Sequence, residues 1–285
     1  MSHVLMSGDH MGLHVTGQGS GYSVVECSVE RKIRFGATAY PGEPTKQTLS
    51  GFPGMGYMRD FGKDLGDTDS LPELPSHTSM KMTLPGPDVL VHVSWKDDVN
   101  QLPGWLNGLT RPILLTWWHE PHGDMTPAAY RATAAKLQPI ISAHPRGHLV
   151  LGHGPAVTRY WMDDKPNTNP MDWWYGGATF FGIDAYNDGP KTDTEYYPSA
   201  EYMFSTGVEF ARSLGVPFVV PEYGLKRITA DATGQGRAGA MSAHGAWLRQ
   251  QSDCLAVGWW NHGENWISTG ADLEVAAWRG VIAGS

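Results

Sequence analysis

The sequence predicts an α/β protein with the (β/α)8 TIM-barrel fold, preceded by a short N-terminal extension. Eight short apolar segments, each of the kind that forms a strand buried on both faces, follow one another along the chain. Helical patterns lie between several of them, and this alternation is typical of a parallel sheet. The segments and helices extend over residues 33–285, a length that suits one closed barrel of ~250 residues.

The expected strands are short and end at turn-forming or polar residues. The first, Ile33–Tyr40, is followed by the turn signal Pro41-Gly42. The others are Gly56–Phe61, Asp88–Trp95, Pro112–Trp118, His148–Gly152, Thr179–Tyr186, Pro217–Pro221 and Leu255–Trp260.

Four longer helices are expected after the fourth strand. Thr126 and Pro127 form a cap and a first-turn proline for a helix that extends to about Ser142, with a kink at Pro139. The others are Ser199–Leu214 with Gly215 after its end, Arg237–Gln251, and a helix from the cap Asp272 to about Ala283.

Two domain regions are expected. Residues 1–32 are rich in Gly, Ser and His and are interpreted as an N-terminal extension that is either a hairpin or partly disordered, whereas residues 33–285 form the barrel. No stretch rich in Pro, Gly or Ser divides the barrel region. An open doubly wound sheet is the main alternative. It is disfavoured because no Gly-x-Gly-x-x-Gly or phosphate-binding loop follows any expected strand.

Composition limits the class of partner. The net charge is −8 and the basic residues do not cluster, which argues against nucleic acid and against an anionic membrane surface as partners. The 12 Trp and 11 Tyr fit a carbohydrate cleft, since a flat ring matches the C–H face of a sugar, but they also fit core packing. Cys27 and Cys254 are too few for a disulfide scaffold, and either a single bridge or two inert thiols fits the sequence.

Candidate site residues gather where the strands end. In a TIM barrel the active site lies at the C-terminal ends of the strands. The predicted site comprises Glu120 and Glu222 as catalytic residues, with Arg59, Trp95, Trp118, His119, Asp184, Tyr186, Tyr223, Trp259 and Trp260 as substrate-binding residues.

The two glutamates suggest a specific chemistry. Glu120 ends the fourth strand and Glu222 the seventh, so they would face each other across a barrel mouth. Hydrolysis of a glycosidic bond needs two such carboxyl groups, one to protonate the leaving oxygen and one to attack the anomeric carbon or activate water. A phenol from Tyr186 or Tyr223 would hold Glu222 ionised. This chemistry requires neither a cofactor nor a metal.

The pattern resembles clan A of the retaining (β/α)8 glycoside hydrolases, and within it the family 26 β-mannanase group. The resemblance covers about residues 33–283 and is carried by His119-Glu120, Asp184-x-Tyr186, Pro221-Glu222-Tyr223-Gly224 and Trp259-Trp260. It implies that Glu120 is the acid/base and Glu222 the nucleophile. It also implies that Tyr186 steadies the nucleophile, that His119 borders the −1 subsite and that Trp259 or Trp260 is a sugar platform.

The motif around Glu120, Trp117-Trp118-His119-Glu120-Pro121, departs from that of the mannanases. Pro121 stands where they usually have Met in Arg-x-x-His-Glu-Met-Asn, and it is closer to the Asn-Glu-Pro of other clan families. Mannan, another polysaccharide and a bacterial cell-wall glycan therefore stay open as substrates. We expect a monomeric, secreted or extracellular protein, although no signal peptide is visible.

Two alternatives remain open at this point. His119, Glu120 and His122 suggest a metal site, but the metalloprotease pattern needs histidines four apart on a helix, and Pro121 interrupts any helix here. A non-catalytic carbohydrate-binding barrel would explain the aromatic residues equally well. It would not explain two opposed glutamates.

Overall fold

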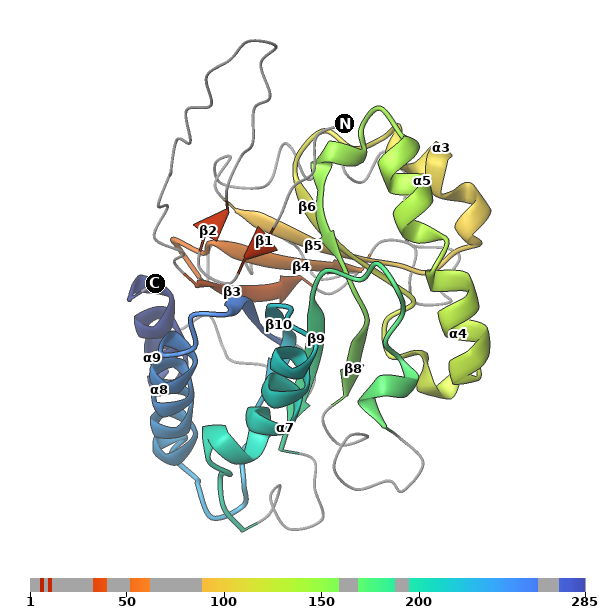
Figure 1. Cartoon of the computed structure of the whole chain (residues 1–285). Helices are drawn as coiled ribbons and strands as arrows, with labels where there is room; N and C mark the ends of the chain where they lie inside the picture. Colours follow the sequence, from red (N-terminus) through yellow and green to blue (C-terminus); the bar gives the residue numbers. More distant parts are fainter. Residues whose placement is uncertain are drawn as a thin grey trace, which may run out of the picture.

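The computed structural model describes residues 6–7, 10–11, 33–39, 52–61, 89–158, 169–187, 195–260 and 272–284. Within them nine parallel strands form one sheet, in the order β7-β6-β5-β4-β3-β11-β10-β9-β8 (Figure 1). All eight expected strands are present, which confirms the α/β class. The strands are β3 (Arg34–Ala39), β4 (Tyr57–Phe61), β5 (Leu90–Trp95), β6 (Ile113–Trp117), β7 (Val150–His153), β8 (Ala156–Thr158), β9 (Phe181–Tyr186), β10 (Phe218–Gly224) and β11 (Cys254–Trp259).

The two strands at the ends of this order, β7 and β8, are consecutive in the chain. β7 pairs with β6, and β8 pairs with β9. Between them the Gly154 amide donates to Leu115 O at 3.1 Å, and the Gly182 amide donates to Pro155 O at 2.8 Å. The sheet therefore curls back on itself, consistent with a TIM-like barrel. The predicted fifth strand, His148–Gly152, ended before Gly154-Pro155, although the chain continues into β8 directly after them.

Alternation along the strands separates two apolar layers. Leu90, Leu114 and Val219 belong to a small cluster with Tyr57, whereas their immediate neighbours in the chain belong to the large core. Successive strand side chains point to opposite faces, so the small cluster fills the inner face of the curled sheet. The large core lies between the sheet and the helices.

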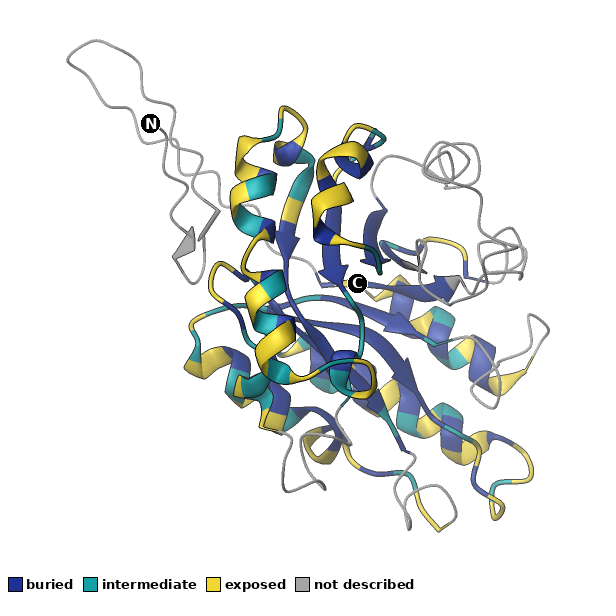
Figure 2. Ribbon diagram, turned by 90° about the vertical axis from the view of Figure 1, so that its right-hand side faces the viewer, coloured by how far each residue is buried: buried dark blue, intermediate teal, exposed yellow. Residues whose placement is uncertain are grey.

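Helices cover the outer face of the sheet. In Figure 1, α7, α8 and α9 form one group, and α3, α4 and α5 form another. Figure 2 shows buried strands inside, while the helices expose their outer faces. The helices are α3 (Leu102–Leu106), α4 (Pro127–Ala134), α5 (Leu137–Ala143), α7 (Ala200–Ser213), α8 (Gln235–Arg249) and α9 (Leu273–Ala283), with 3-10 turns η1 (Val99–Gln101), η2 (Pro121–Gly123), η3 (Gly147–Leu149) and η4 (Pro170–Asp172).

Local sequence signals explain the helix ends. Thr126 caps α4 by accepting a bond from the Ala129 amide, and Ser199 caps α7. Gly215 follows α7 with a positive φ of 69°, which favours glycine. The single helix predicted to reach Ser142 is instead two helices, α4 and α5. Pro139 lies in the first turn of α5, where its ring and missing N–H prevent a continuous helix.

Several other expectations fall partly outside the described residues. Within the predicted N-terminal extension, β1 (Met6–Ser7) pairs antiparallel with β2 (His10–Met11). Cys254 is a buried free thiol, and burial raises its pKa, whereas Cys27 lies outside the described residues. Among the described helices, none has the length and apolarity needed to cross a membrane.

Candidate active site

The chain leaves β6 through an unusual backbone turn. Trp118 has φ 55° and Glu120 has φ 48°, and both lie in the left-handed region that non-glycine residues rarely adopt. The Trp118 amide donates to Trp95 O at 3.0 Å, and the Glu120 amide donates to Ala156 O at 3.1 Å. The turn is therefore anchored to β5 on one side and to β8 on the other. Its side chains are held at the C-terminal end of the sheet.

His119 joins two buried carboxylates. Its Nε2 lies 2.9 Å from Asp184 Oδ2 and 3.0 Å from Glu222 Oε1. Glu222 Oε2 accepts a bond of 2.5 Å from the Tyr186 hydroxyl. Asp184 is fully buried and Glu222 is only 3% exposed. Ends of β6, β9 and β10 thus meet in one polar cluster, as the sequence predicted for these four residues.

The charged groups of this cluster shift one another's pKa values. Burial alone would lower the pKa of His119, but Glu222, Asp184 and Glu120 together raise that pKa well above its usual range. Burial would raise the pKa of Glu222, but His119, Arg59 and the Tyr186 bond outweigh it and lower that pKa. An imidazolium therefore faces an ionised Glu222. Burial and the charge of Glu222 raise the pKa of Asp184.

Arg59 supports Glu222 from the interior of the sheet. It is fully buried, and its guanidinium lies 3.9 Å from Glu222 Oε1. Arg59 also donates to Ser94 and lies 3.2 Å from Nε2 of His92, which in turn is 2.8 Å from the Thr116 hydroxyl. Arg59 was predicted to bind substrate. Its complete burial makes it instead a residue that holds Glu222 in place.

Glu120 has a partner that the sequence did not reveal. The Thr158 hydroxyl, at the end of β8, donates to Glu120 Oε1. Thr158 was missed because β8 was not predicted. The signal was present in the run Ala156-Val157-Thr158, which contains two β-branched residues directly after Gly154-Pro155.

Three of the predicted substrate-binding aromatics are core residues. Trp95 is 2% exposed and packs against Trp105, with ring centroids 5.8 Å apart. Tyr223 and Trp259 are fully buried and pack edge-to-face at 5.1 Å. All three point towards the helices, because they occupy the outer positions of their strands. Only Trp118 and Trp260 of the predicted tryptophans are partly exposed.

The alternative of a metal site involves different residues in the structure. His119, Asp184 and Glu222, but not His122, place potential ligand atoms within 4.8 Å of one another. Nε2 of His119 already contacts both carboxylates directly, so a cation would have to displace the imidazole proton from them. The pKa of His122 falls to about 4 through burial and the nearby charge of His119. The donor set fits an ion-paired triad better than a metal centre.

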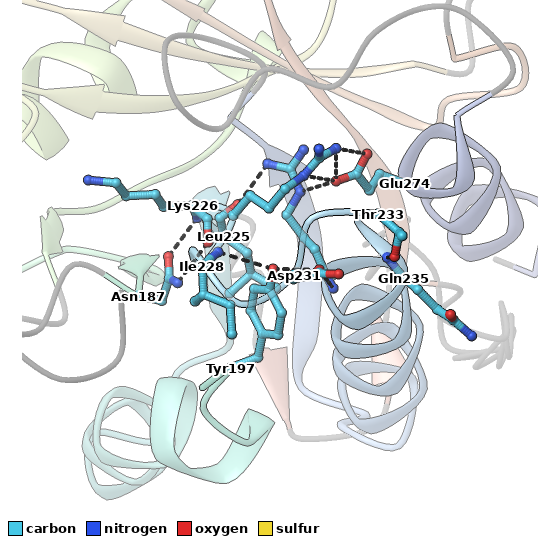
Figure 3. Close-up of polar contacts among 11 residues, drawn as sticks. Asn187, Tyr197, Leu225, Lys226, Ile228, Asp231, Thr233, Gln235 and Glu274 are labelled. Carbon is cyan, nitrogen blue, oxygen red and sulfur yellow. Dashed lines mark hydrogen bonds and ion pairs between the residues drawn. The ribbon is translucent and has the colours of Figure 1, made fainter. Parts of the chain in front are cut away.

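The loop that follows β10 is fixed by a second polar network (Figure 3). Glu274 of α9 accepts bonds from Arg227, at 2.6 and 2.9 Å, and from Arg237, at 2.7 Å. Asn187, directly after β9, bonds the Lys226 amide at 2.6 Å and its carbonyl at 3.0 Å. The loop next to Glu222 is therefore held by two helices and by the neighbouring strand.

Comparisons with known proteins point to one group of structures. No family model matches the sequence, and no curated protein matches it. The chain is similar to a mutant GH128 (subgroup I) endo-β-1,3-glucanase from Amycolatopsis mediterranei in complex with laminaripentaose, with a TM-score of 0.54 and 15% identity over 86% of this chain and 98% of that one. It is also similar to a Cellulomonas fimi endo-β-1,4-mannanase double mutant, with a TM-score of 0.52 and 13% identity over 88% of this chain and 70% of that one.

A third similar structure carries a different description. It is a GH128 (subgroup VII) oligosaccharide-binding protein from Trichoderma gamsii, with a TM-score of 0.50 and 12% identity over 88% of this chain and 94% of that one. At these identities the likeness concerns the fold. It agrees with the resemblance to clan A at that level, and the assignment to family 26 stays a prediction.

Proposed function

We propose that the protein is a retaining glycoside hydrolase in which Glu222 is the nucleophile and Glu120 the acid/base. The observation that carries the proposal is the environment of Glu222. The Tyr186 hydroxyl donates to one oxygen, Oε2, while the other, Oε1, lies 3.0 Å from Nε2 of His119 and 3.9 Å from the Arg59 guanidinium. These neighbours keep the Glu222 carboxylate ionised and fixed in place, as a carboxylate nucleophile requires.

In the first step the Glu222 carboxylate attacks the anomeric carbon while the Glu120 carboxyl gives its proton to the departing oxygen. The glycosidic C–O bond breaks and a glycosyl–enzyme ester forms. In the second step Glu120 removes a proton from water, the water oxygen attacks the anomeric carbon, and Glu222 leaves as a carboxylate. His119 and Arg59 stabilise that carboxylate in the free enzyme.

The sheet topology supports a proposal about the fold, and the comparisons support one about the substrate. We count β7 and β8 as one interrupted strand, which makes the sheet a closed eight-stranded barrel. The similar glucanase and mannanase support a neutral polysaccharide or oligosaccharide as substrate. A polymeric substrate of this kind also supports action outside the cell, and the monomeric state stays a prediction.

A non-catalytic oligosaccharide-binding protein is the second candidate. The similarity to the Trichoderma gamsii protein favours it. The buried, charged environment of Glu222 argues for catalysis, since binding a neutral sugar has no need of a buried, ion-paired carboxylate.

The decisive test is hydrolysis by the purified chain of laminarin, mannan, glucan, xylan, galactan and cell-wall glycans, with proton NMR of the first product. Retention of the anomeric configuration is expected. Glu222→Ala should abolish turnover, and azide should restore it as a glycosyl azide of inverted configuration. Full activity of Glu222→Ala would contradict the mechanism. No turnover of any glycan, together with tight binding of one, would favour the second candidate.

A further inference from the structure

A cluster of three side chains lies at the rim beside the site, and we call Lys96, Trp118 and Asp124 the rim cluster. The Trp118 indole N–H donates to Asp124 Oδ2 at 2.8 Å, and Lys96 Nζ donates to the same oxygen at 2.6 Å. The Lys96 ammonium also lies 4.8 Å from the centre of the Trp118 ring. The Trp118 indole is thus held by a hydrogen bond from its N–H and by the Lys96 ammonium over its ring, while part of the side chain stays exposed.

The backbone of Trp118 brings this ring to the rim. Thr116 points to the inner face of the sheet, where it bonds His92. Regular alternation would send Trp118 to the same face. The left-handed turn at Trp118 prevents this and lets His119 enter the interior instead, to reach Glu222. Bulky residues rarely adopt such a backbone, and where they do the conformation often serves a functional site.

The contacts of Trp118 differ from those of the proposed acid/base, whose carboxylate accepts a bond from Thr158 of β8. Those of Trp118 are made with Trp117, with Lys96 after β5 and with Asp124 after η2. His119, the next residue, extends towards β9 and β10, where the nucleophile lies. The sugar that is attacked must sit over Glu222, and the sugar that leaves must sit beside the acid that protonates it.

We propose that the rim cluster is a subsite for the leaving group, in which the exposed part of the Trp118 indole stacks on a pyranose ring. Lys96 and Asp124 bond the hydroxyl groups of that ring. Their charges neutralise each other, so the subsite suits an uncharged sugar rather than a uronic acid. This inference rests on the proposed function, because it places the sugar relative to Glu120 and Glu222.

The test compares two substrates that share the donor sugar. One is the hexaose, among laminari-, manno- and cellohexaose, that the full chain cleaves fastest. The other is the nitrophenyl glycoside of the same sugar, which places no sugar in the leaving-group half. Trp118→Ala should lower kcat/KM for the hexaose by about tenfold or more and change it for the nitrophenyl glycoside by less than about threefold.

Two further variants keep the result interpretable. Trp118→Tyr retains a ring and should retain most of the activity on the hexaose, and it replaces Trp118→Ala if that variant does not fold. Trp247→Ala is the matched control, since Trp247 is a partly buried tryptophan of α8 that stacks on Phe204. Equal losses on both substrates, or no loss with the hexaose, would overturn the subsite.

The subsite and the hydrolase proposal fail in different ways. If the unmodified chain cleaves no hexaose, hydrolysis is refuted, and calorimetry of hexaose binding then tests the rim cluster by itself. Weaker binding by Trp118→Ala than by Trp247→Ala would support the cluster as a sugar site. Equal binding by the two variants, or no binding by the unmodified chain, would overturn it.

Discussion

Replacing Glu274 by Ala should destabilise the protein strongly, because the buried guanidinium of Arg237 loses the carboxylate that neutralises its charge. The side chain of Arg237 is 4% exposed and that of Glu274 is 3% exposed, so neither charge is screened by water. Breaking a buried pair by removing one partner typically costs about 3–5 kcal/mol. The second partner, Arg227, is 40% exposed, and such a pair contributes only about 0–1 kcal/mol.

Urea denaturation of the full chain, followed by tryptophan fluorescence, measures these free energies of unfolding. Glu274→Ala and Arg237→Ala should each lose about 3–5 kcal/mol, and Arg227→Ala should lose about 1 kcal/mol or less. The double variant Glu274→Leu/Arg237→Met should recover most of the loss, since an apolar pair removes the unpaired charge. Similar losses in Arg227→Ala and Glu274→Ala would refute the reasoning from burial.

Three further outcomes are expected. Tyr186→Phe should move the acid limb of the kcat/KM profile to higher pH, because Glu222 loses a donor that lowers its pKa, and an unmoved limb would contradict this role. Gly207→Ala should cost about 1–3 kcal/mol in urea denaturation, because the new Cβ would lie 2.6 Å from Ile183 Cδ1. Burial lowers the pKa of His153 to about 4, so the neutral folded form loses about 3 kcal/mol of stability as pH falls from 6.5 towards 4. Urea denaturation of His153→Gln at pH 7 and 4.5 should show a smaller difference than the unmodified chain does.

The positions of the strands could be predicted because burial on both faces leaves a plain apolar signature. β5 and β6 are buried at every residue, and each was expected within two residues of its observed bounds. The acidic residues at the ends of β6 and β10 followed from the same signature, because each stands where an apolar segment of the sequence stops. Both predicted catalytic carboxylates therefore belong to one end of the sheet.

The direction of the aromatic rings was partly predictable as well. Glu222 faces the interior, so its neighbour Tyr223 must face the helices, where its hydroxyl lies 2.8 Å from Nδ1 of His244. The prediction that Tyr223 binds substrate ignored this alternation. The same reasoning assigns Trp95 to the core, since Ser94 bonds Arg59 on the inner face.

Alternation fails at Trp118 and Glu120, and no sequence pattern could have shown this. Left-handed backbone is readable from sequence where glycine occupies it, but not where a tryptophan and a glutamate do. Each such residue costs about 1–3 kcal/mol, which the surrounding structure must offset. The bonds from Trp118 N to β5 and from Glu120 N to β8 hold both conformations. The left-handed backbone of the two residues that flank His119, one on each side, directs the imidazole towards Glu222 and places Glu120 beside Thr158. The proposed chemistry thus depends on the part of the chain where local preference and structure disagree.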